Sequence, residues 1–442
     1  MSMNTNPIEK IIKSRTVARE KGIYSCCSAN EYVIRAALRR AKAADTVVLV
    51  EATANQVNQN GGYTGMTPAD FKSFLDRLAK KENFPSEKIL CGGDHLGPLT
   101  WQNLPEQEAM KRAEELIREY VSAGFVKIHI DTTMRLDDDD KTTMLSDETI
   151  ARRSAVLCKA AEEAYAIYAV NHPDAPPPVY VVGSEVPVPG GAVENEDSVQ
   201  ITALDDCRRS MQAFEREFKA NGLEDALARI IAIVVQPGVE FADESVVTYN
   251  SALAKGLLAY LEVDNKGVVF EGHSTDYQPR ECLRNMVKDG IAILKVGPAL
   301  TFSMREGLFA LEQIERELYS YNDLILSEFR ATLEKEMLKN DIYWAKYYHG
   351  DLSRERYARA YSLSDRARYY LSADAVRESI EHLLINLDKA GIPMSLLSQY
   401  MPVQYQRVHS GRLAVCAEDL LIDHIGDVID DYLYAILQDY EN

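Results

Sequence analysis

Eight short apolar runs alternate with amphipathic stretches between residues 22 and 296 of the chain. The runs are continuously apolar or nearly so, which is typical of strands buried on both faces. Between them, apolar side chains recur every three or four positions, which predicts helices. We expect strands at residues 22–26, 46–51, 125–131, 179–185, 230–236, 267–273 and 291–296, and a further strand that ends at Asp94 and His95.

This alternation predicts a closed barrel. Helices between successive strands require parallel pairing, and eight strand–helix units are what a (β/α)8 TIM barrel needs. An open, doubly wound sheet is the competing interpretation, but no GxGxxG motif follows the first strand. After Thr301 only helical periodicity remains, with residues 304–320 as the eighth barrel helix. We therefore expect a barrel over residues 1–320 and a helical extension, packed on it, over residues 321–442.

Length and charge narrow the class of protein. The 442 residues agree with a barrel plus an extension, because a single hydrophobic core rarely exceeds about 250–300 residues. The chain carries 49 Lys and Arg against 68 Asp and Glu, a formal net charge of −19. No basic stripe offsets this charge, which argues against nucleic acid as a partner. A local group of arginines could still hold a phosphorylated substrate.

The amino terminus and the cysteines bear on location. Residues 1–10 are polar without an apolar signal core, and no apolar run approaches the roughly 20 residues that span a bilayer. We expect no membrane contact and a cytoplasmic location. Seven cysteines include the adjacent pair Cys26 and Cys27 but no CxxC motif. Adjacent cysteines are poorly placed to bond with each other, so reduced thiols are expected.

Ionisable side chains gather at the predicted carboxyl ends of the strands, where TIM barrels place their active sites. Burying so many charged groups is costly unless they pair with each other, a metal or a ligand. As a set they indicate a functional site. The group is Glu51, Asp94, His95, Lys127, His129, Asp131, Glu185, His273 and Lys295.

A divalent metal, expected to be zinc, is predicted to be held by His95, His273 and Glu185. Two imidazoles and a carboxylate leave a coordination position open for a substrate oxygen. A lone histidine is more often a core residue whose hydrogen bonds are made within the protein. Two histidines at the ends of two strands instead favour a role as metal ligands. Asp94 lies beside a ligand and is expected to transfer protons, and Glu51 is the second residue assigned to catalysis.

Polar residues around this set are assigned to substrate binding. They are Asn55, Lys127, His129, Asp131, Ser274, Asp276, Lys295, Gly297 and Arg366. The turns at 272–276 and 297–299 offer backbone donors after the seventh and eighth strands, where barrels often bind phosphate. Arg366 and Arg368 could add charge from the extension, although two arginines on a helix are more often surface groups. His129 could equally form a salt bridge with a neighbour.

A metal-free mechanism is open on the same fold. Lys127 or Lys295 could form a Schiff base with a ketose. The surrounding carboxylates argue against it, because they raise the pKa of a lysine rather than lower it.

Several long stretches, spread over nearly the whole chain, carry a resemblance to a known family. They include Gly92-Gly-Asp-His-Leu-Gly-Pro98 and Gly183-Ser-Glu-Val-Pro-Val-Pro-Gly-Gly191, and the others lie at 51–71, 231–241, 273–278, 293–302 and 361–366. In these residues the chain closely resembles the Z subunits of tagatose-1,6-bisphosphate aldolase, from the galactitol and N-acetylgalactosamine pathways.

The resemblance implies a barrel related to class II aldolases and a role beside a separate catalytic Y subunit, whose activity and stability the Z subunit supports. Related class II aldolases carry an Asp-His pair after the third strand as proton-transfer acid and metal ligand, which Asp94 and His95 match, and His273 matches a later histidine. The chain departs from them at Glu185, where they have a middle histidine, and in the phosphate loop, which is reduced to residues 272–276. The family has also been labelled tagatose 6-phosphate kinase, but no GxxxxGK(S/T) loop is present.

Two functions follow from these expectations. In the first, the chain is a non-catalytic Z subunit that stabilises and activates a partner aldolase in galactitol, N-acetylgalactosamine or tagatose breakdown, and its polar barrel mouth is inherited. In the second, it is a metal-dependent 4-epimerase of tagatose and fructose 6-phosphates that breaks the C3–C4 bond and re-forms it on the other face. The complete set of acid and ligands favours the epimerase, and the thinned phosphate loop favours the subunit. The expected ligands are a divalent metal and a phosphorylated ketohexose, and the expected partners are the Y subunit and a second copy of the chain.

Overall fold

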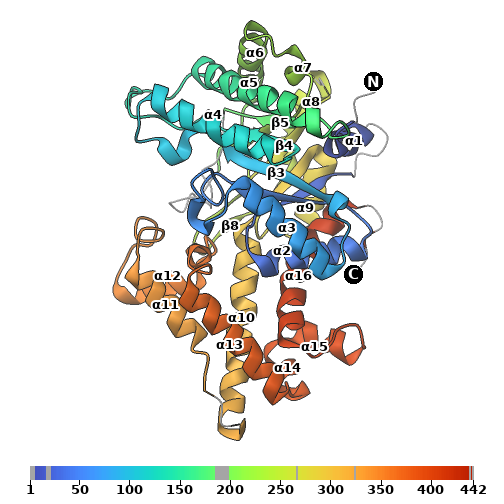
Figure 1. The fold of residues 1–442 in the computed structure, drawn as a ribbon, viewed down its shortest axis with the longest axis vertical. Coiled ribbons are helices and arrows are strands. Elements are labelled where there is room, and N and C mark those ends of the chain that lie inside the picture. Colours follow the sequence, from blue (N-terminus) through green and yellow to red (C-terminus); the bar gives the residue numbers. More distant parts are fainter. Residues whose placement is uncertain are drawn as a thin grey trace.

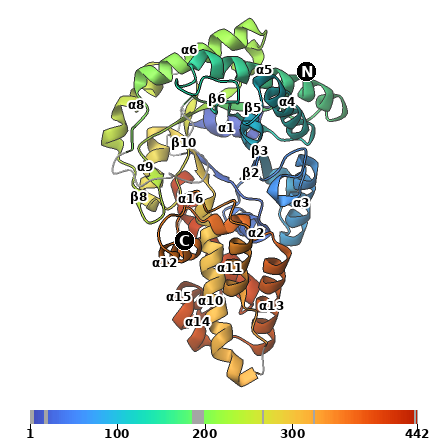
Figure 2. The ribbon, with the colours of Figure 1, turned by 90° about the vertical axis from the view of Figure 1, so that its left-hand side faces the viewer.

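The computed structural model describes residues 5–15, 21–184, 199–264, 267–322, 325–437 and 440. Its centre is a closed barrel of eight parallel strands in the order β1-β10-β9-β6-β5-β4-β3-β2 (Figures 1 and 2). The strands are β1 (Ile23–Cys26), β2 (Val48–Thr53), β3 (Ile89–Leu96), β4 (Lys127–Ile130), β5 (Val179–Val182), β6 (Ile230–Val235), β9 (Val269–Gly272) and β10 (Ile291–Val296). The predicted TIM barrel is confirmed, and each expected run forms a strand.

Helices join the strands and cover the outer face of the barrel. Their starts are set by local chemistry: Asn30, Thr67, Ser146 and Asn250 each accept a backbone N–H bond as N-caps. The helices are α2 (Glu31–Ala43), α3 (Pro68–Glu82), α4 (Glu106–Ser122), α5 (Asp147–Asn171), α6 (Leu204–Ala220), α7 (Glu224–Leu227), α8 (Ser251–Val263) and α9 (Arg280–Asp289). Short 3-10 turns lie at Gly62–Thr64, Ser86–Lys88 and Pro98–Trp101, and a hairpin of β7 (Glu240–Phe241) and β8 (Val246–Val247) lies between β6 and α8.

The amino end of the barrel is closed by apolar packing. Helix α1 (Pro7–Ser14) places the buried side chains of Ile8 and Ile12 in one cluster with inward-facing strand residues such as Leu49 and Ile293. Asn6 ties this helix to the barrel by donating to the carbonyl of Val126 at 2.8 Å. Because this end is filled with apolar side chains, the ionisable residues of the strands are confined to the other half of the barrel.

The carboxyl-terminal part is helical, as expected. It comprises α10 (Pro298–Asn322), α11 (Phe329–Lys339), α12 (Leu352–Tyr361), the 3-10 turn η4 (Arg366–Tyr369), α13 (Asp374–Ala390), α14 (Met394–Tyr400), α15 (Pro402–His409) and α16 (Ala417–Ile436). Helices α11 to α15 form a lobe beside the barrel. Helix α10 runs from the barrel to the end of this lobe that lies farthest from the barrel (Figure 1).

The eighth helix of the barrel is not the one expected. Helix α10 leaves the barrel, and the last helix, α16, packs against α2, α9 and β1. Three arginines of α2 pair with carboxylates of α16: Arg35 with Glu418 at 2.6 Å, Arg39 with Asp419 at 2.7 Å and Arg40 with Asp423 at 3.0 Å. The expected boundary at residue 320 therefore falls inside α10, and the end of the chain completes the barrel's outer ring.

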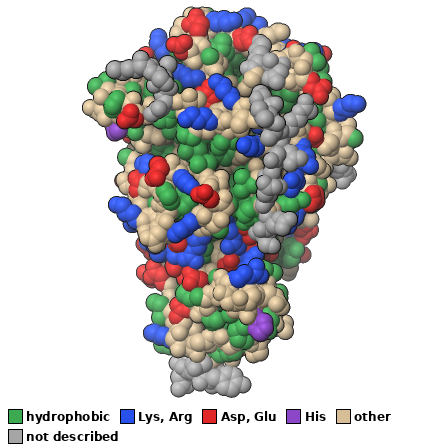
Figure 3. Space-filling model, turned by 90° about the vertical axis from the view of Figure 1, so that its right-hand side faces the viewer, with side chains coloured by type: hydrophobic (Ala, Val, Ile, Leu, Met, Phe, Trp, Pro, Cys, Tyr) green, Lys and Arg blue, Asp and Glu red, His purple; other side chains and the backbone are tan. Residues whose placement is uncertain are grey.

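The surface carries both signs of charge. On the face in Figure 3, Lys and Arg side chains are interspersed with Asp and Glu, and hydrophobic side chains reach the surface between them. Among the described helices, none has the length and apolar composition needed to cross a membrane.

Candidate metal and substrate site

A layer of paired charges lies inside the barrel, next to the apolar cluster that fills its amino end. The ammonium group of Lys127 lies 2.6 Å from Glu51 Oε1 and 2.7 Å from Glu271 Oε2, and all three side chains are fully buried. Glycine makes room for this layer, because a Cβ on Gly92 would lie 2.7 Å from Glu51 Oε1. Lys295 contacts Glu51 as well and lies 2.5 Å from Asp94 Oδ1. The layer is thus a compensated network rather than a set of lone charges.

Asp94 and His95 are neighbours in β3, yet both line the same cavity. In a regular strand, successive side chains point to opposite faces. Here the register between β3 and β4 shifts between Gly93 and Leu96, and His95 has a φ of 47°. That left-handed conformation is costly for a residue other than glycine and persists only where its surroundings hold it. The irregularity lets one strand present an acid and an imidazole to the barrel mouth together.

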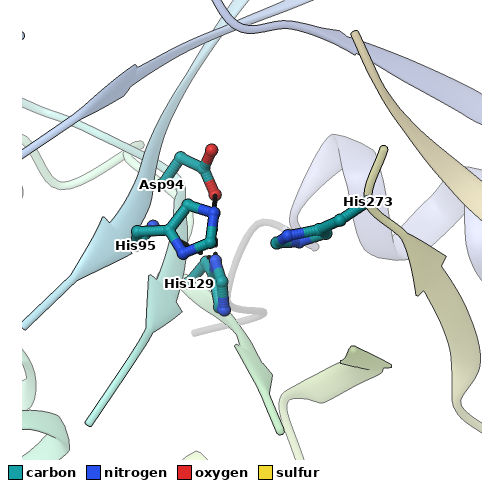
Figure 4. A group of neighbouring side chains, drawn as sticks. All are labelled: Asp94, His95, His129 and His273. Carbon is teal, nitrogen blue, oxygen red and sulfur yellow. Dashed lines mark hydrogen bonds and ion pairs between the residues drawn. The ribbon is translucent and has the colours of Figure 1, made fainter. Parts of the chain in front are cut away.

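Three imidazoles meet above the charged layer. His95, His129 and His273 have ring centroids 4.9 to 5.2 Å apart. One donor atom from each, with a carboxylate oxygen of Asp94, lies within 4.8 Å of the others, and all four residues are buried. His273 faces the other three across the barrel mouth (Figure 4). The structure therefore adds His129 to the expected pair, while Glu185 lies outside the described residues.

Each of these histidines has a carboxylate behind it. His95 Nδ1 lies 2.9 Å from Asp131 Oδ2, and His129 Nδ1 lies 2.9 Å from Asp94 Oδ1. His273 Nε2 lies 3.0 Å from Glu271 Oε1. A carboxylate that accepts one ring N–H fixes the tautomer and leaves the other nitrogen with a free lone pair, as in metal-ligating histidines. His129 differs from the other two, because its Nδ1 also accepts the backbone N–H of His95 at 3.1 Å.

The donor set suits a divalent metal. His129 Nε2 is buried and has no hydrogen-bond partner among the described residues, and a buried polar atom of this kind is costly without a ligand or another partner. Burial lowers the pKa of His273 to about 3, and the nearby Glu271 offsets only part of this effect. The His273 ring is therefore neutral at physiological pH. Three imidazoles fit zinc and other first-row divalent ions.

Both buried lysines are held in the charged form. Burial alone would lower the pKa of Lys295, but the carboxylates of Asp94 and its neighbours raise it well above the ordinary value. Burial is likewise outweighed for Lys127, where Glu271 and Glu51 raise the pKa. Protonated amines are not nucleophiles, which argues against the Schiff-base mechanism.

The histidine group opens into a cavity of about 440 Å³ between the barrel mouth and the extension. Eight of the predicted residues line it: Asn55, Asp94, His95, His273, Ser274, Asp276, Lys295 and Gly297. Five predicted residues lie behind this lining: Glu51 and Lys127 in the charged layer, His129 and Asp131 beside His95, and Arg366 in the extension. Of these, Asp131 positions His95 rather than meeting the cavity.

The expected phosphate cradle after the eighth strand is already occupied. The backbone N–H groups of Gly297 and Ala299 donate to Asp276 Oδ1 at 3.0 and 2.8 Å. A side-chain carboxylate therefore takes the place at the start of α10 where the predicted phosphate would bind. These donors are consequently not free for a substrate.

Two residues at the site were missed by sequence reasoning. Glu271 lies two positions before His273, so the period of two in a strand could have placed both on the inner face. Cys27 lines the cavity, and no local pattern marks it, because it only follows a strand end. Arg368, considered with Arg366 as a source of charge from the extension, lines the cavity as well.

Comparison with known proteins places this chain in a family. A family model described as "D-tagatose-1,6-bisphosphate aldolase subunit GatZ/KbaZ-like" matches residues 8–437. A crystal structure of a probable tagatose 6 phosphate kinase from Sinorhizobium meliloti 1021 is 41% identical, with a TM-score of 0.85, and the match covers 94% of this chain and 100% of that one.

More distant structures are also similar. A fructose-bisphosphate aldolase from Campylobacter jejuni is 14% identical over 87% of this chain and 92% of that one, with a TM-score of 0.42. The fructuronate-tagaturonate epimerase UxaE from Cohnella laeviribosi is 13% identical over 95% of this chain and 82% of that one, with a TM-score of 0.41. Likenesses this weak say nothing about the chemistry of the present site. The family match spans almost the whole chain, and the chain belongs to the GatZ/KbaZ-like family of D-tagatose-1,6-bisphosphate aldolase subunits.

Proposed function

We propose that the chain binds a divalent metal ion through His95, His129 and His273 and acts on a ketohexose phosphate by aldol-type chemistry. The observation that carries this proposal is the convergence of three buried imidazoles, each with its second ring nitrogen against a carboxylate. Metal-ligating histidines commonly have this arrangement. The proposal assigns the place expected for Glu185 to His129.

The chemistry follows from what faces the cavity. A divalent ion at this site, expected to be zinc, would act as a Lewis acid on the substrate carbonyl. Asp94 is ionised, because Lys295 and the neighbouring histidines outweigh its burial and hold its pKa well below the ordinary value. It is therefore a base that can take a proton from a substrate hydroxyl. The ammonium group of Lys295 lines the same cavity and stabilises negative charge that develops there.

Applied to a ketohexose 6-phosphate, this constellation performs a retro-aldol step. Asp94 takes the proton of the C4 hydroxyl, the C3–C4 bond breaks, and its electron pair moves towards the C2 carbonyl. Re-addition to the other face of the C4 aldehyde re-forms the bond, and Asp94 returns the proton to the C4 oxygen. The net change is inversion at C4, so this reading makes the chain a 4-epimerase of tagatose and fructose 6-phosphates.

The family description favours a second candidate. Its members are described as aldolase subunits, so the chain would then act as the Z subunit beside a catalytic Y subunit and support that partner's activity and stability. In this case the metal site would serve structure or the partner rather than turnover by the chain alone.

One assay separates the two candidates. The purified, metal-loaded chain is mixed with tagatose 6-phosphate, with and without the Y subunit, and fructose 6-phosphate and the aldol cleavage of tagatose 1,6-bisphosphate are both measured. Interconversion by the chain alone, lost with a chelator, identifies an epimerase. An inert chain that raises the partner's aldolase activity identifies a subunit, and a chain that does neither contradicts the proposal.

Metal removal should also weaken the fold. A ligand that binds only the folded chain at about 100 times its Kd adds about 2.7 kcal/mol to the free energy of unfolding. We expect a chelator to remove this amount and zinc to restore it, as measured by urea unfolding followed by circular dichroism. The variant His172→Ala, at an exposed site at the end of α5, should show the same metal dependence as the wild type. Unfolding that is indifferent to the chelator, in a protein shown to contain no metal before treatment, would contradict the predicted site.

A further inference from the structure

A substrate with an anionic end needs a positively charged or hydrogen-bond-donating partner in this cavity. The backbone donors at the start of α10, where barrels often bind phosphate, are not available for this role. The start of α10 is filled by the carboxylate of Asp276, which accepts from Gly297 and Ala299. A carboxylate at this place repels a second anion as well as using its donors. The anionic end of a substrate that reaches the histidines must therefore be bound elsewhere in the cavity.

Arg368 offers that partner from the extension. It lies in η4 and lines the cavity that His95 and His273 also line. Its guanidinium donates to two carbonyls, of Ser364 and Asp365, and to the phenol oxygen of Tyr369 at 3.2 Å. These acceptors are neutral, and no carboxylate of the described chain lies within 4.0 Å of this guanidinium. Arg368 therefore has no directly paired carboxylate, although the charges of Asp365 and Asp276 act on it without such a pair.

The carboxylate of Asp365, close to Arg368 in the chain, makes its direct contacts with other groups. Asp365 accepts from Thr301 Oγ1 at 2.6 Å and from Arg305 Nε at 3.3 Å. Its direct ion pair is with Arg305, and its charge acts on Arg368 without such a pair. A partly buried guanidinium without a directly paired carboxylate is costly to maintain, and an anionic ligand lowers that cost.

The surroundings of Arg368 are shaped for a polar ligand. The rings of Tyr63 and Tyr369, both in the cavity lining, are 5.0 Å apart, and Tyr343 stacks on Tyr369 at 4.7 Å. Behind them, the guanidinium of Arg366 lies 3.4 Å from the ring of Tyr347, and its buried Nε has no hydrogen-bond partner among the described residues. The aromatic rings fix the geometry, and Arg366 adds a second positive charge from behind the lining.

We infer that Arg368, with the hydroxyls of Tyr63 and Tyr369, binds the anionic end of the substrate, so that the helical extension rather than a barrel loop selects for a charged ketohexose. This inference rests on the proposed function for the other end of the substrate. A guanidinium fork recognises phosphate and carboxylate alike, so the anion is either a sugar phosphate or a keto-uronate. The extension then supplies one end of the site and the barrel supplies the other.

Calorimetric titration of the metal-loaded chain tests the inference with fructose 6-phosphate, fructuronate and uncharged fructose. Arg368→Gln should weaken binding of the preferred anion about tenfold to a hundredfold, as expected for the loss of a charged hydrogen bond. Binding of fructose and the metal content should stay unchanged. Arg368→Lys should lie between the two, because it keeps the charge but loses the fork. Arg356→Gln, at an exposed site on α12, is the matched control and should bind like the wild type.

The ligand that responds identifies the anion. A selective loss of fructose 6-phosphate assigns a phosphate to this end, and a selective loss of fructuronate assigns a carboxylate. The inference is overturned if folded Arg368→Gln binds both anions like the wild type, or if it loses fructose to the same extent.

Inorganic phosphate separates failure of this inference from failure of the proposed function. Phosphate should quench or enhance tyrosine fluorescence in the wild type, with or without metal, and should not do so in Arg368→Gln. A chain that binds no metal and no sugar but shows this phosphate response loses the proposed function and keeps the anion site. If Arg368→Gln does not fold, competition in the wild type decides: phosphate should displace the charged sugar but not fructose, and indifference of the charged sugar to phosphate would refute the site.

Discussion

Replacing Asp94 with asparagine should lower kcat by about a hundredfold to ten-thousandfold, the range typical of a lost general acid–base group, and leave the bound metal in place. Asparagine cannot accept a proton at neutral pH, so the step that begins with deprotonation of a hydroxyl is lost. Asparagine keeps the shape of the side chain, and either its amide oxygen or its amide nitrogen can meet His129 Nδ1, which lies 2.9 Å from Asp94 Oδ1. Turnover is measured as interconversion of the two ketose 6-phosphates, or with the Y subunit if the chain needs it, and metal content by atomic spectroscopy.

Two further variants serve as comparisons for Asp94→Asn. His95→Ala should lose the metal and the activity together, because one of three ligands disappears. His172→Ala, far from the barrel mouth at the end of α5, should change neither. An Asp94→Asn protein that turns over within tenfold of the wild type would remove Asp94 from proton transfer. One that loses the metal would make Asp94 chiefly a support for His129.

The barrel could be predicted from sequence because its strands are unambiguous. Runs such as 230–236 and 291–296 are apolar throughout, and the intervening helices carry N-caps and a clear apolar face. Both signals are local, and parallel pairing follows from the alternation alone. The place of α16 is not local: it depends on ion pairs such as Arg35 with Glu418, which join residues far apart in the chain. The sequence pattern therefore indicates one more helix but not which helix closes the ring.

The site was predictable only in part for a similar reason. Strand periodicity placed Lys127 and His129 on one face, and the same rule pairs Glu271 with His273. The rule fails at Asp94 and His95, where a register shift and a positive φ turn adjacent side chains to the same cavity. Such an irregularity is a property of the assembled sheet. A regular strand would have sent one of these two side chains away from the cavity.

In the helical extension, too, the sequence alone could not show which residue faces the cavity. Arg366 and Arg368 are two positions apart in one short turn, and composition alone cannot rank them. Only packing distinguishes the two, because Arg366 lies over Tyr347 while Arg368 meets the cavity. Contacts between lobes that are distant in sequence thus decide which cation faces a ligand.

Replacing Lys127 with methionine should lower the free energy of unfolding by about 3–5 kcal/mol, the usual cost of leaving a buried ion pair with one partner. Its ammonium group lies 2.6 Å from Glu51 and 2.7 Å from Glu271, and no water-exposed surface remains on any of the three. Methionine fills a similar volume, so the loss reports on charge rather than on packing. Urea unfolding gives the value.

A second substitution tests the cause of this loss. Adding Glu51→Gln to Lys127→Met removes one negative charge together with the positive one, so the double variant should recover part of the lost stability, with a coupling energy of about 1–3 kcal/mol. Lys141→Met, whose ammonium is exposed and 3.8 Å from Asp137, should change stability by less than about 0.5 kcal/mol. A Lys127→Met protein as stable as this control would mean that Glu51 or Glu271 already carries a proton. In that case the layer beneath the histidines would not be the balanced ionic network on which the charge of Asp94, and with it the proposed proton transfer, depends.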